Sequence, residues 1–121
     1  MSNFIPKSKR NRKKSDTPTK DIFHIGTLEI NISLHSVSID SKVISFAKKE
    51  FEALAYLAMH KGNIISRKAL LNAVWGEGII VLERTIDVHI RKIREKLGKY
   101  SYLIETVKGV GYCFRGNKRN K

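Results

Sequence analysis

The residues with the most informative chemistry lie between positions 84 and 97. Cationic and hydroxyl side chains are frequent here, and such groups contact the phosphate oxygens of nucleic acids. If the stretch is helical, its polar side carries Arg84, Thr85, Val88, Arg91, Lys92, Glu95 and Lys96, with His89 and Arg94 on the flanks. Fourteen helical residues span about 21 Å, enough to lie in a DNA major groove. A solvated surface helix would show the same pattern, so the rest of the chain must decide.

Hydrophobic periodicity supports a helix over these residues. Ile86, Ile90, Ile93 and Leu97 recur at i, i+4, i+7 and i+11, which is the narrow apolar stripe of one amphipathic helix. Gly98 follows the last apolar position, where a helix usually stops. The sequence therefore predicts a helix over 84–97 with one buried side.

The net charge of +13 is concentrated at the two ends of the chain. Residues 84–121 hold eleven Lys or Arg and three Asp or Glu, a net of +8, and residues 1–20 hold a net of +6. The stretch 21–83 has a net of −1. This distribution favours a polyanionic partner that meets one face. A membrane surface would also require exposed Trp, Phe or Leu beside the charge, which the 84–97 helix lacks.

Composition points to one globular domain with a tail. The 121 residues are 41% hydrophobic and contain no apolar run long enough for a transmembrane helix or a secretory signal. The single cysteine, Cys113, excludes an internal disulfide framework and suits a reducing cytoplasm.

No pattern of an enzyme or a cofactor site is present. A nucleophile–base pair and a carboxylate pair are both missing, and Gly109 and Gly111 lie outside any nucleotide-binding motif. The four histidines, His24, His35, His60 and His89, show no metal-ligand spacing. We therefore expect no catalytic residues, cofactor or metal.

The order of predicted elements defines an α+β fold. Short strands at 22–25, 28–32, 37–40 and 43–44 precede a helix at 47–60, an extended link at 64–65 and a helix at 67–74 capped by Ser66. The 84–97 helix follows, and a hairpin comes last, with strands at 103–107 and 112–115. Three helices and a hairpin after a small antiparallel sheet make a winged helix-turn-helix at 21–116. Residues 1–20 are expected to be a basic disordered tail or linker, and residues 117–121 a basic C-terminal tail.

Several sequence blocks resemble the C-terminal effector domain of OmpR/PhoB-type bacterial response regulators. The matching blocks are KEF at 49–51 with Leu54 and Leu57; SR at 66–67 with Leu70 and Leu71; VWG at 74–76; RTIDVHI at 84–90 with Ile93, Arg94, Lys96 and Leu97; and IETVKGVGY at 104–112 with Phe114. They follow the family's order and spacing over about residues 22–115. The last two blocks are the specific ones.

The resemblance implies a transcription regulator of a two-component system that binds tandem sites on double-stranded DNA, with a possible head-to-tail dimer. Its 84–97 helix would lie in the major groove. The residues implied to hold phosphates are Arg84, Thr85, His89, Arg91 and Thr106. Val88, Lys92 and Arg94 would face base edges. Lys108 would enter the minor groove, and Tyr112 would support the hairpin.

The loop 75–83 resembles the segment that activators of the family present to RNA polymerase. Its candidate contacts are Glu77, Ile79, Ile80 and Glu83. The apolar run at 79–82 is expected to pack against the 84–97 helix, and an exposed partner patch is the alternative.

Three features depart from the family pattern. Phe46-Ala47 replaces the usual Leu-Thr before the first helix, so Glu50 is expected to lack its capping-box partner. That loss would cost about 0.5–2 kcal/mol. Lys92 and Lys108 stand where arginine is frequent, which makes bidentate guanine recognition less secure. No receiver domain lies within these residues, so the chain is expected to be an isolated effector domain or a stand-alone regulator.

Two further expectations concern single residues. An acidic residue facing DNA would be repelled, so Asp87 is expected to be structural, and it could pair with Arg91 four residues later. Trp75 is expected to pack at the end of its helix, and a phosphate contact from its ring nitrogen is the alternative. The competing functions are binding of an acidic protein through the basic helix, and RNA binding.

Overall fold

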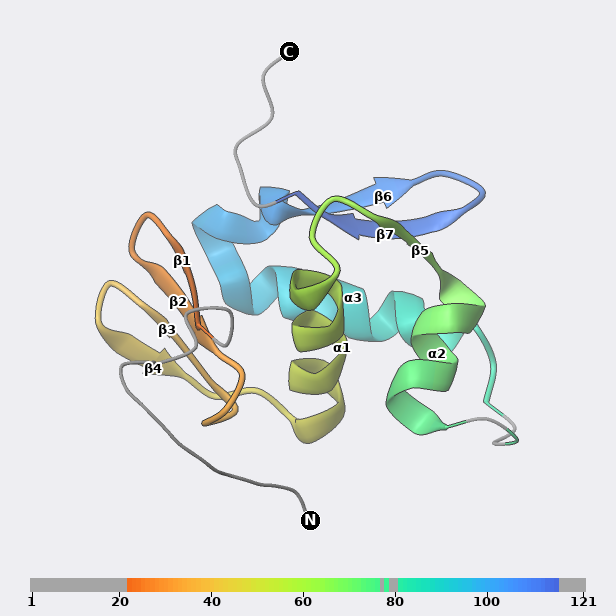
Figure 1. Cartoon of the computed structure of the whole chain (residues 1–121), viewed down its shortest axis with the longest axis horizontal. Coiled ribbons are helices and arrows are strands. Elements are labelled where there is room, and N and C mark those ends of the chain that lie inside the picture. The colour runs from red at the N-terminus through yellow and green to blue at the C-terminus, as the bar shows by residue number, and fades with distance from the viewer. Residues whose placement is uncertain (1–21, 77, 79–80, 116–121) are drawn as a thin grey trace, which may run out of the picture.

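Two antiparallel sheets flank a unit of three helices in the computed structural model, which describes residues 22–76, 78 and 81–115 (Figure 1). The four-stranded sheet contains β1 (Ile22–Ile25), β2 (Leu28–Asn31), β3 (Ser36–Ile39) and β4 (Lys42–Ile44). The helices are α1 (Lys48–Met59), α2 (Arg67–Trp75) and α3 (Arg84–Leu97). The second sheet contains β5 (Ile64–Ser66), β6 (Ile104–Val107) and β7 (Gly111–Phe114), and a 3₁₀ helix (Gly98–Leu103) leads from α3 into β6. The predicted winged helix-turn-helix is confirmed.

The N-terminal sheet is a meander in the order β1-β2-β3-β4. Its alternating residues Leu28, Ile30 and Val37 are almost fully buried, as the period of two in the sequence predicts. The turn between β3 and β4 uses Asp40 and Ser41 in the left-handed region, with φ of 54° and 68°. This two-residue loop is the predicted hairpin turn and keeps the twist of the flanking strands.

Local capping explains where α1 and α2 begin. The Ser66 Oγ accepts a hydrogen bond from the Ala69 N–H at 3.0 Å, so the predicted N-cap of α2 is confirmed. Glu50 reaches back to the Ala47 N–H, with 3.1 Å between Oε1 and N. The expectation that Glu50 lacks its partner is therefore half wrong. Ala47 has no hydroxyl to cap α1, but the return bond of the capping box is present.

Helix α3 has the bounds that the sequence predicts. Ile86, Ile90, Ile93 and Leu97 form its buried stripe, none more than 1% exposed. Gly98 ends the helix in the left-handed region, at φ 55°. In Figure 1, α3 runs behind α1, and the two helices are in contact. Because the apolar stripe packs inward, the polar side of α3 faces away from the core.

The C-terminal wing has three strands, whereas the sequence predicts two. Residues 64–65 do not form a simple link, because β5 pairs with β7 in the strand order β5-β7-β6. Tyr112 lies at the centre of this sheet, opposite Ile65 on one side and Thr106 on the other. As a result, the start of α2 is joined directly to the wing.

The segment between α2 and α3 is described only in part. Glu77, Ile79 and Ile80 lie outside the described residues. Val81 packs against the core, as expected for the apolar run, whereas Leu82 is 68% exposed. Across the parts of the chain that the structure describes, no helix is long and apolar enough to cross a membrane.

Candidate nucleic-acid interface

The exposed side of α3 collects four of the ten residues implied to contact DNA. Arg84, Val88, Arg91 and Lys92 are all exposed there, opposite the buried stripe. Glu95 shares this side, with its carboxylate 3.7 Å from Arg91 Nε, and both side chains are mostly exposed. An ion pair this exposed is weak, so Arg91 remains available to another anion. The helix thus presents three cations and the apolar Val88 on one surface.

Asp87 lies on the side of α3 that faces the wing. Its carboxylate accepts two hydrogen bonds from Arg67, from Nη2 at 2.8 Å and from Nε at 3.2 Å. The Tyr112 hydroxyl donates a third, with 2.6 Å between Oη and Oδ1. The structural role expected for Asp87 agrees with these contacts. The pairing with Arg91 that the helical spacing allowed is not formed, because Arg67 of α2 takes that place.

Arg94 also points toward the wing. Its guanidinium donates to the Ile104 carbonyl from Nη2 at 2.7 Å and from Nε at 3.1 Å, and to the Thr106 hydroxyl at 2.7 Å. It also lies 5.7 Å from the centre of the Tyr112 ring. The sequence expectation that Arg94 faces base edges does not match this orientation. Thr106 is exposed. Its hydroxyl oxygen accepts from Arg94, so its O–H can still donate to an acceptor outside the protein.

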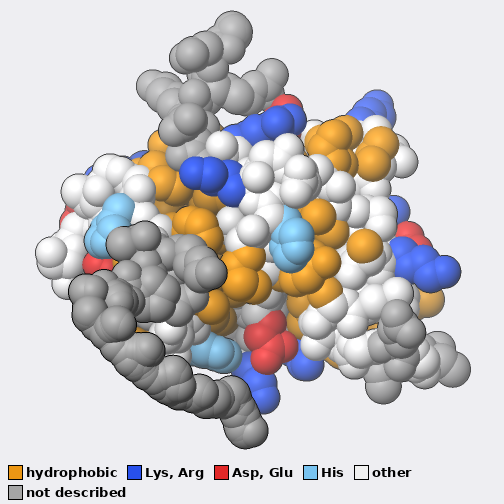
Figure 2. Space-filling view, in the orientation of Figure 1, with side chains coloured by type: hydrophobic (Ala, Val, Ile, Leu, Met, Phe, Trp, Pro, Cys, Tyr) orange, Lys and Arg blue, Asp and Glu red, His pale blue; other side chains and the backbone are white. Residues whose placement is uncertain are grey.

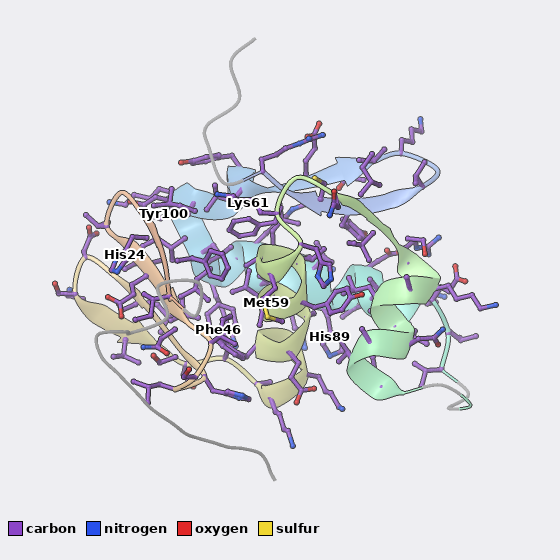
Figure 3. The ribbon with its side chains drawn as sticks, in the orientation of Figure 1. His24, Phe46, Met59, Lys61, His89 and Tyr100 are labelled. Atoms are coloured by element: carbon purple, nitrogen blue, oxygen red, sulfur yellow. The ribbon has the colours of Figure 1, made fainter. Side chains whose placement is uncertain are left out.

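The opposite flank of α3 packs against α2 and α1. His89, labelled in Figure 3, is half-buried. Its Nδ1 lies 2.9 Å from the Thr85 carbonyl oxygen, and its ring meets the Trp75 ring edge-on, with 5.0 Å between the ring centres. Lys49 Nζ lies 2.8 Å from the Val74 carbonyl oxygen and 5.7 Å from the Trp75 ring. Trp75 therefore packs at the end of α2, as predicted. Thr85 and His89 border the exposed face and do not lie at its centre.

A cleft of about 380 Å³ separates the start of α2 from the wing. Its walls carry Ser66 at the end of β5, Arg67 and Lys68 from α2, Glu83 and Asp87 near the start of α3, and 106–112 from the wing. Lys108 and Val110 are exposed at the wing tip, and Tyr112 is 7% exposed. Burial, followed by the hydrogen bond to Asp87, raises the pKa of Tyr112 to about 12. Tyr112 is therefore a neutral donor that holds the floor of the cleft.

The face opposite the exposed side of α3 has a different character. Figure 2 views the molecule with α1 in front, and hydrophobic side chains occupy much of the middle of that face. The Lys and Arg side chains lie mostly toward its margins.

Within the described residues, no group of three or more His, Cys, Asp or Glu is placed to hold a metal ion.

A winged helix-turn-helix that presents a basic face of its third helix defines a class of DNA-binding proteins. The comparisons with known proteins agree with that class. The chain belongs to the family described as "Transcriptional regulatory protein, C terminal", whose model matches residues 41–114, and is an OmpR/PhoB-type DNA-binding domain. It is thus a transcriptional regulatory DNA-binding domain of response regulators, and the family is not one of enzymes.

Two curated relatives show the extent of the match. The phosphate regulon regulatory protein PhoB of Pseudomonas aeruginosa is 40% identical over 91 residues, which cover 74% of this chain and 40% of PhoB. The response regulator ArlR of Staphylococcus haemolyticus is 37% identical over 100 residues, which cover 81% of this chain and 46% of ArlR. The chain therefore spans less than half the length of these relatives.

Two solved structures show the same fold. The response regulator DrrB of Thermotoga maritima, an OmpR/PhoB homologue, aligns with a TM-score of 0.72 and 33% identity over 78% of this chain and 44% of DrrB. The RstA DNA-binding domain of Klebsiella pneumoniae, solved in complex with the RstA box, aligns with a TM-score of 0.68 and 31% identity. That alignment covers 78% of this chain and 97% of the RstA domain.

Proposed function

We propose that the chain binds specific double-stranded DNA sites by placing α3 in the major groove and the wing tip in the minor groove. The carrying observation is that the exposed side of α3 presents Arg84, Arg91, Lys92 and Val88 together. A groove helix needs this mixture, because cations hold phosphates while mid-helix side chains reach base edges.

Each exposed residue has a role that follows from its position. Arg84 lies at the start of α3 and Arg91 two turns later, where both can reach phosphates flanking the groove. Val88 can contact a thymine methyl group, and Lys92 can donate to the acceptors of guanine. Thr85, His89 and Thr106 border this surface and would add phosphate contacts. We propose that Arg94 orients the wing, because its guanidinium donates to Ile104 and Thr106.

The wing would supply a second contact through Lys108. This side chain is exposed at the tip, next to Gly109. Narrow A·T-rich minor grooves concentrate negative potential and attract such a cation. Tyr112 supports the wing from within, since its ring is buried and its hydroxyl is bonded to Asp87.

Partners beyond DNA form a separate part of the proposal. Relatives were solved with a named DNA box or an intercistronic region, and we propose that this chain binds tandem sites as a head-to-tail dimer. RNA polymerase would meet the segment before α3. Of its candidate contacts only Glu83 is described, half-exposed and 3.9 Å from Arg67 Nη1. Regulation of transcription would place the protein with the DNA, in the bacterial cytoplasm.

A salt titration on duplexes of different sequence tests the DNA proposal. If about six phosphates are neutralised, a plot of log affinity against log salt should have a slope near −5. Selection of bound sites from random duplexes should then return one preferred sequence. Equal affinity for all duplexes, or a flat salt dependence, would contradict the proposal. Stronger binding to RNA, or binding only to an acidic protein, would favour the competing functions.

A further inference from the structure

We infer that Asp87 is a positioning residue that holds the wing in place against α3, so that the two DNA contacts act as one unit. The inference rests on the proposed function. From the sequence, Asp87 is a surface residue of α3 that could pair within the same helix. In the structure, its carboxylate lies where α3, α2 and β7 meet.

The carboxylate of Asp87 joins α3 to α2 and to β7. Arg67 at the start of α2 donates to both of its oxygens, at 3.2 and 2.8 Å. The Tyr112 hydroxyl donates from the middle of β7 at 2.6 Å. Since β7 lies between β5 and β6, this hydroxyl anchors the central strand of the wing sheet. One side chain of α3 is therefore bonded to the central strand of the wing.

Arg94 supplies a second attachment on the same side of α3. It lies seven residues after Asp87, two helical turns along, and donates to the Ile104 carbonyl and the Thr106 hydroxyl of β6. Its guanidinium lies 5.7 Å from the Tyr112 ring. Two attachments separated along a helix resist rocking of the sheet, which a single attachment would allow. The Asp87 attachment is the nearer one in sequence to the Arg84 end of α3.

The exposure of the Asp87–Arg67 pair indicates that the pair positions the wing more than it stabilises the fold. The two side chains are 41% and 39% exposed, and ion pairs of this exposure contribute little to stability. A carboxylate on a helix that meets a polyanion would also repel it, unless a cation neutralises the charge. Arg67 does so with two hydrogen bonds. The main effect of Asp87 is therefore on the position of the wing relative to α3.

The consequence of this geometry appears at the wing tip. Lys108 stands four residues before Tyr112, beyond the end of the paired strands. A small rotation of β7 about its anchor therefore moves Lys108 toward or away from the groove. Loss of the Tyr112–Asp87 hydrogen bond should weaken the contribution of Lys108 without changing the exposed face of α3.

A double-mutant cycle on two duplexes tests the inference. The duplexes share the preferred site and differ only in A·T or G·C pairs at the flank that the wing meets. The variants are Tyr112→Phe, Lys108→Ala and the pair combined, measured beside wild type. In the wild-type background, Lys108→Ala should weaken binding to the A·T duplex by about 10-fold. In the Tyr112→Phe background, the loss of affinity caused by Lys108→Ala should be at least about 3-fold smaller. The reason is that the effects of coupled residues are not additive.

Tyr100→Phe is the matched control. It also removes a tyrosine hydroxyl that makes two hydrogen bonds, to the Thr27 N–H at 2.7 Å and to the Thr27 hydroxyl at 2.9 Å. Those bonds join the 3₁₀ helix to the turn between β1 and β2, away from α3's exposed face and the wing tip. Tyr100→Phe should leave the cost of Lys108→Ala and the A·T preference unchanged. Asp87→Ala removes both acceptor oxygens, and so the hydrogen bonds from Tyr112 and Arg67. It should reduce the cost of Lys108→Ala as Tyr112→Phe does.

The outcomes distinguish the two proposals. If wild type selects its site but Tyr112→Phe and Tyr100→Phe behave alike, Asp87 is only a stabilising residue and the inference is wrong. A folded Asp87→Ala variant in which Lys108→Ala keeps its full cost would overturn it as well, even if Tyr112→Phe fails to fold. If wild type shows no preference among duplexes, the proposed function fails and the inference fails with it.

Discussion

Lys96 Nζ lies 2.7 Å from Glu50 Oε1, and this contact joins the end of α3 to the first turn of α1. Glu50 is only 5% exposed, whereas the Lys96 side chain is 35% exposed. The ammonium also lies 5.2 Å from the ring centre of Phe46, which is labelled in Figure 3. The sequence pattern places Lys96 on the polar side of α3, but the structure uses it as the partner of a buried carboxylate.

The first prediction concerns the stability that this pair supplies. Lys96→Met leaves Glu50 buried without its cation and should lower the free energy of unfolding at pH 7 by about 1–3 kcal/mol. Arg91→Met is the control, because its pair with Glu95 is mostly exposed and should contribute less than about 1 kcal/mol. Urea denaturation checks both variants. Equal losses would show that the Glu50 pair is no stronger than a surface pair.

The same pair should make stability fall in acid. Burial raises the pKa of Glu50, but hydrogen bonds from Lys96 and the Ala47 N–H outweigh it and hold the pKa below the usual range. A carboxylate with a lowered folded pKa stabilises the protein above its unfolded pKa of about 4.3. That contribution is lost as the pH falls through the folded pKa. The stability difference between wild type and Glu50→Gln should therefore shrink from pH 6 to pH 3.

The second prediction concerns alkaline pH. The pKa of Tyr112 is raised to about 12 by burial and by the bond to Asp87, so the folded state holds its proton more tightly than the unfolded state, whose pKa is about 10. Stability from this residue is fully present below pH 10 and declines between pH 10 and pH 12, by on the order of 2 kcal/mol. The Tyr112→Phe variant has no hydroxyl to ionise at this position, so it should lack this part of the stability loss at high pH. Denaturation of both proteins at pH 9 and pH 11 measures it, and parallel losses would contradict the assigned pKa.

The third prediction separates base reading from phosphate contact on α3. Lys92→Ala should relax preference at one or two base pairs, costing about 1–3 kcal/mol of discrimination, because the residue is exposed in the middle of the helix. Arg84→Ala should weaken binding to all duplexes alike, since it lies at the helix start. Site selection with each variant checks this. An unchanged preference in Lys92→Ala would refute the orientation proposed for α3.

The fourth prediction concerns the close approach of β5 and β7. A Cβ at Gly111 would lie 2.0 Å from the Ile65 carbonyl oxygen, so Gly111→Ala forces these paired strands apart. The expected cost is about 1–3 kcal/mol or more, with weaker DNA binding as the wing shifts. Gly109→Ala is the control, because nothing lies within 4 Å of its Cβ and only its φ of +80° opposes alanine. Thermal unfolding should therefore show the larger loss for Gly111→Ala.

Local sequence signals were enough to determine the three helices, the strands of the N-terminal sheet and the buried side of α3. The spacing of Ile86, Ile90, Ile93 and Leu97 decides which side of that helix is buried, and hence which residues remain outside. Ser66 and Gly98 mark helix boundaries through their own side chain and backbone, without help from distant residues. The family resemblance rests on motifs of this local kind.

Only the tertiary structure decided which polar residues meet. Asp87 pairs with Arg67, twenty positions away, and not with Arg91 on its own helix. Lys96 reaches Glu50 on α1, Arg94 turns toward β6, and β5 joins the wing as a third strand. Periodicity encodes the buried side of each element but not the angle at which elements cross. A long polar side chain at the edge of an apolar stripe can contact solvent, DNA or another element. The angle at which the elements cross decides which of these it contacts.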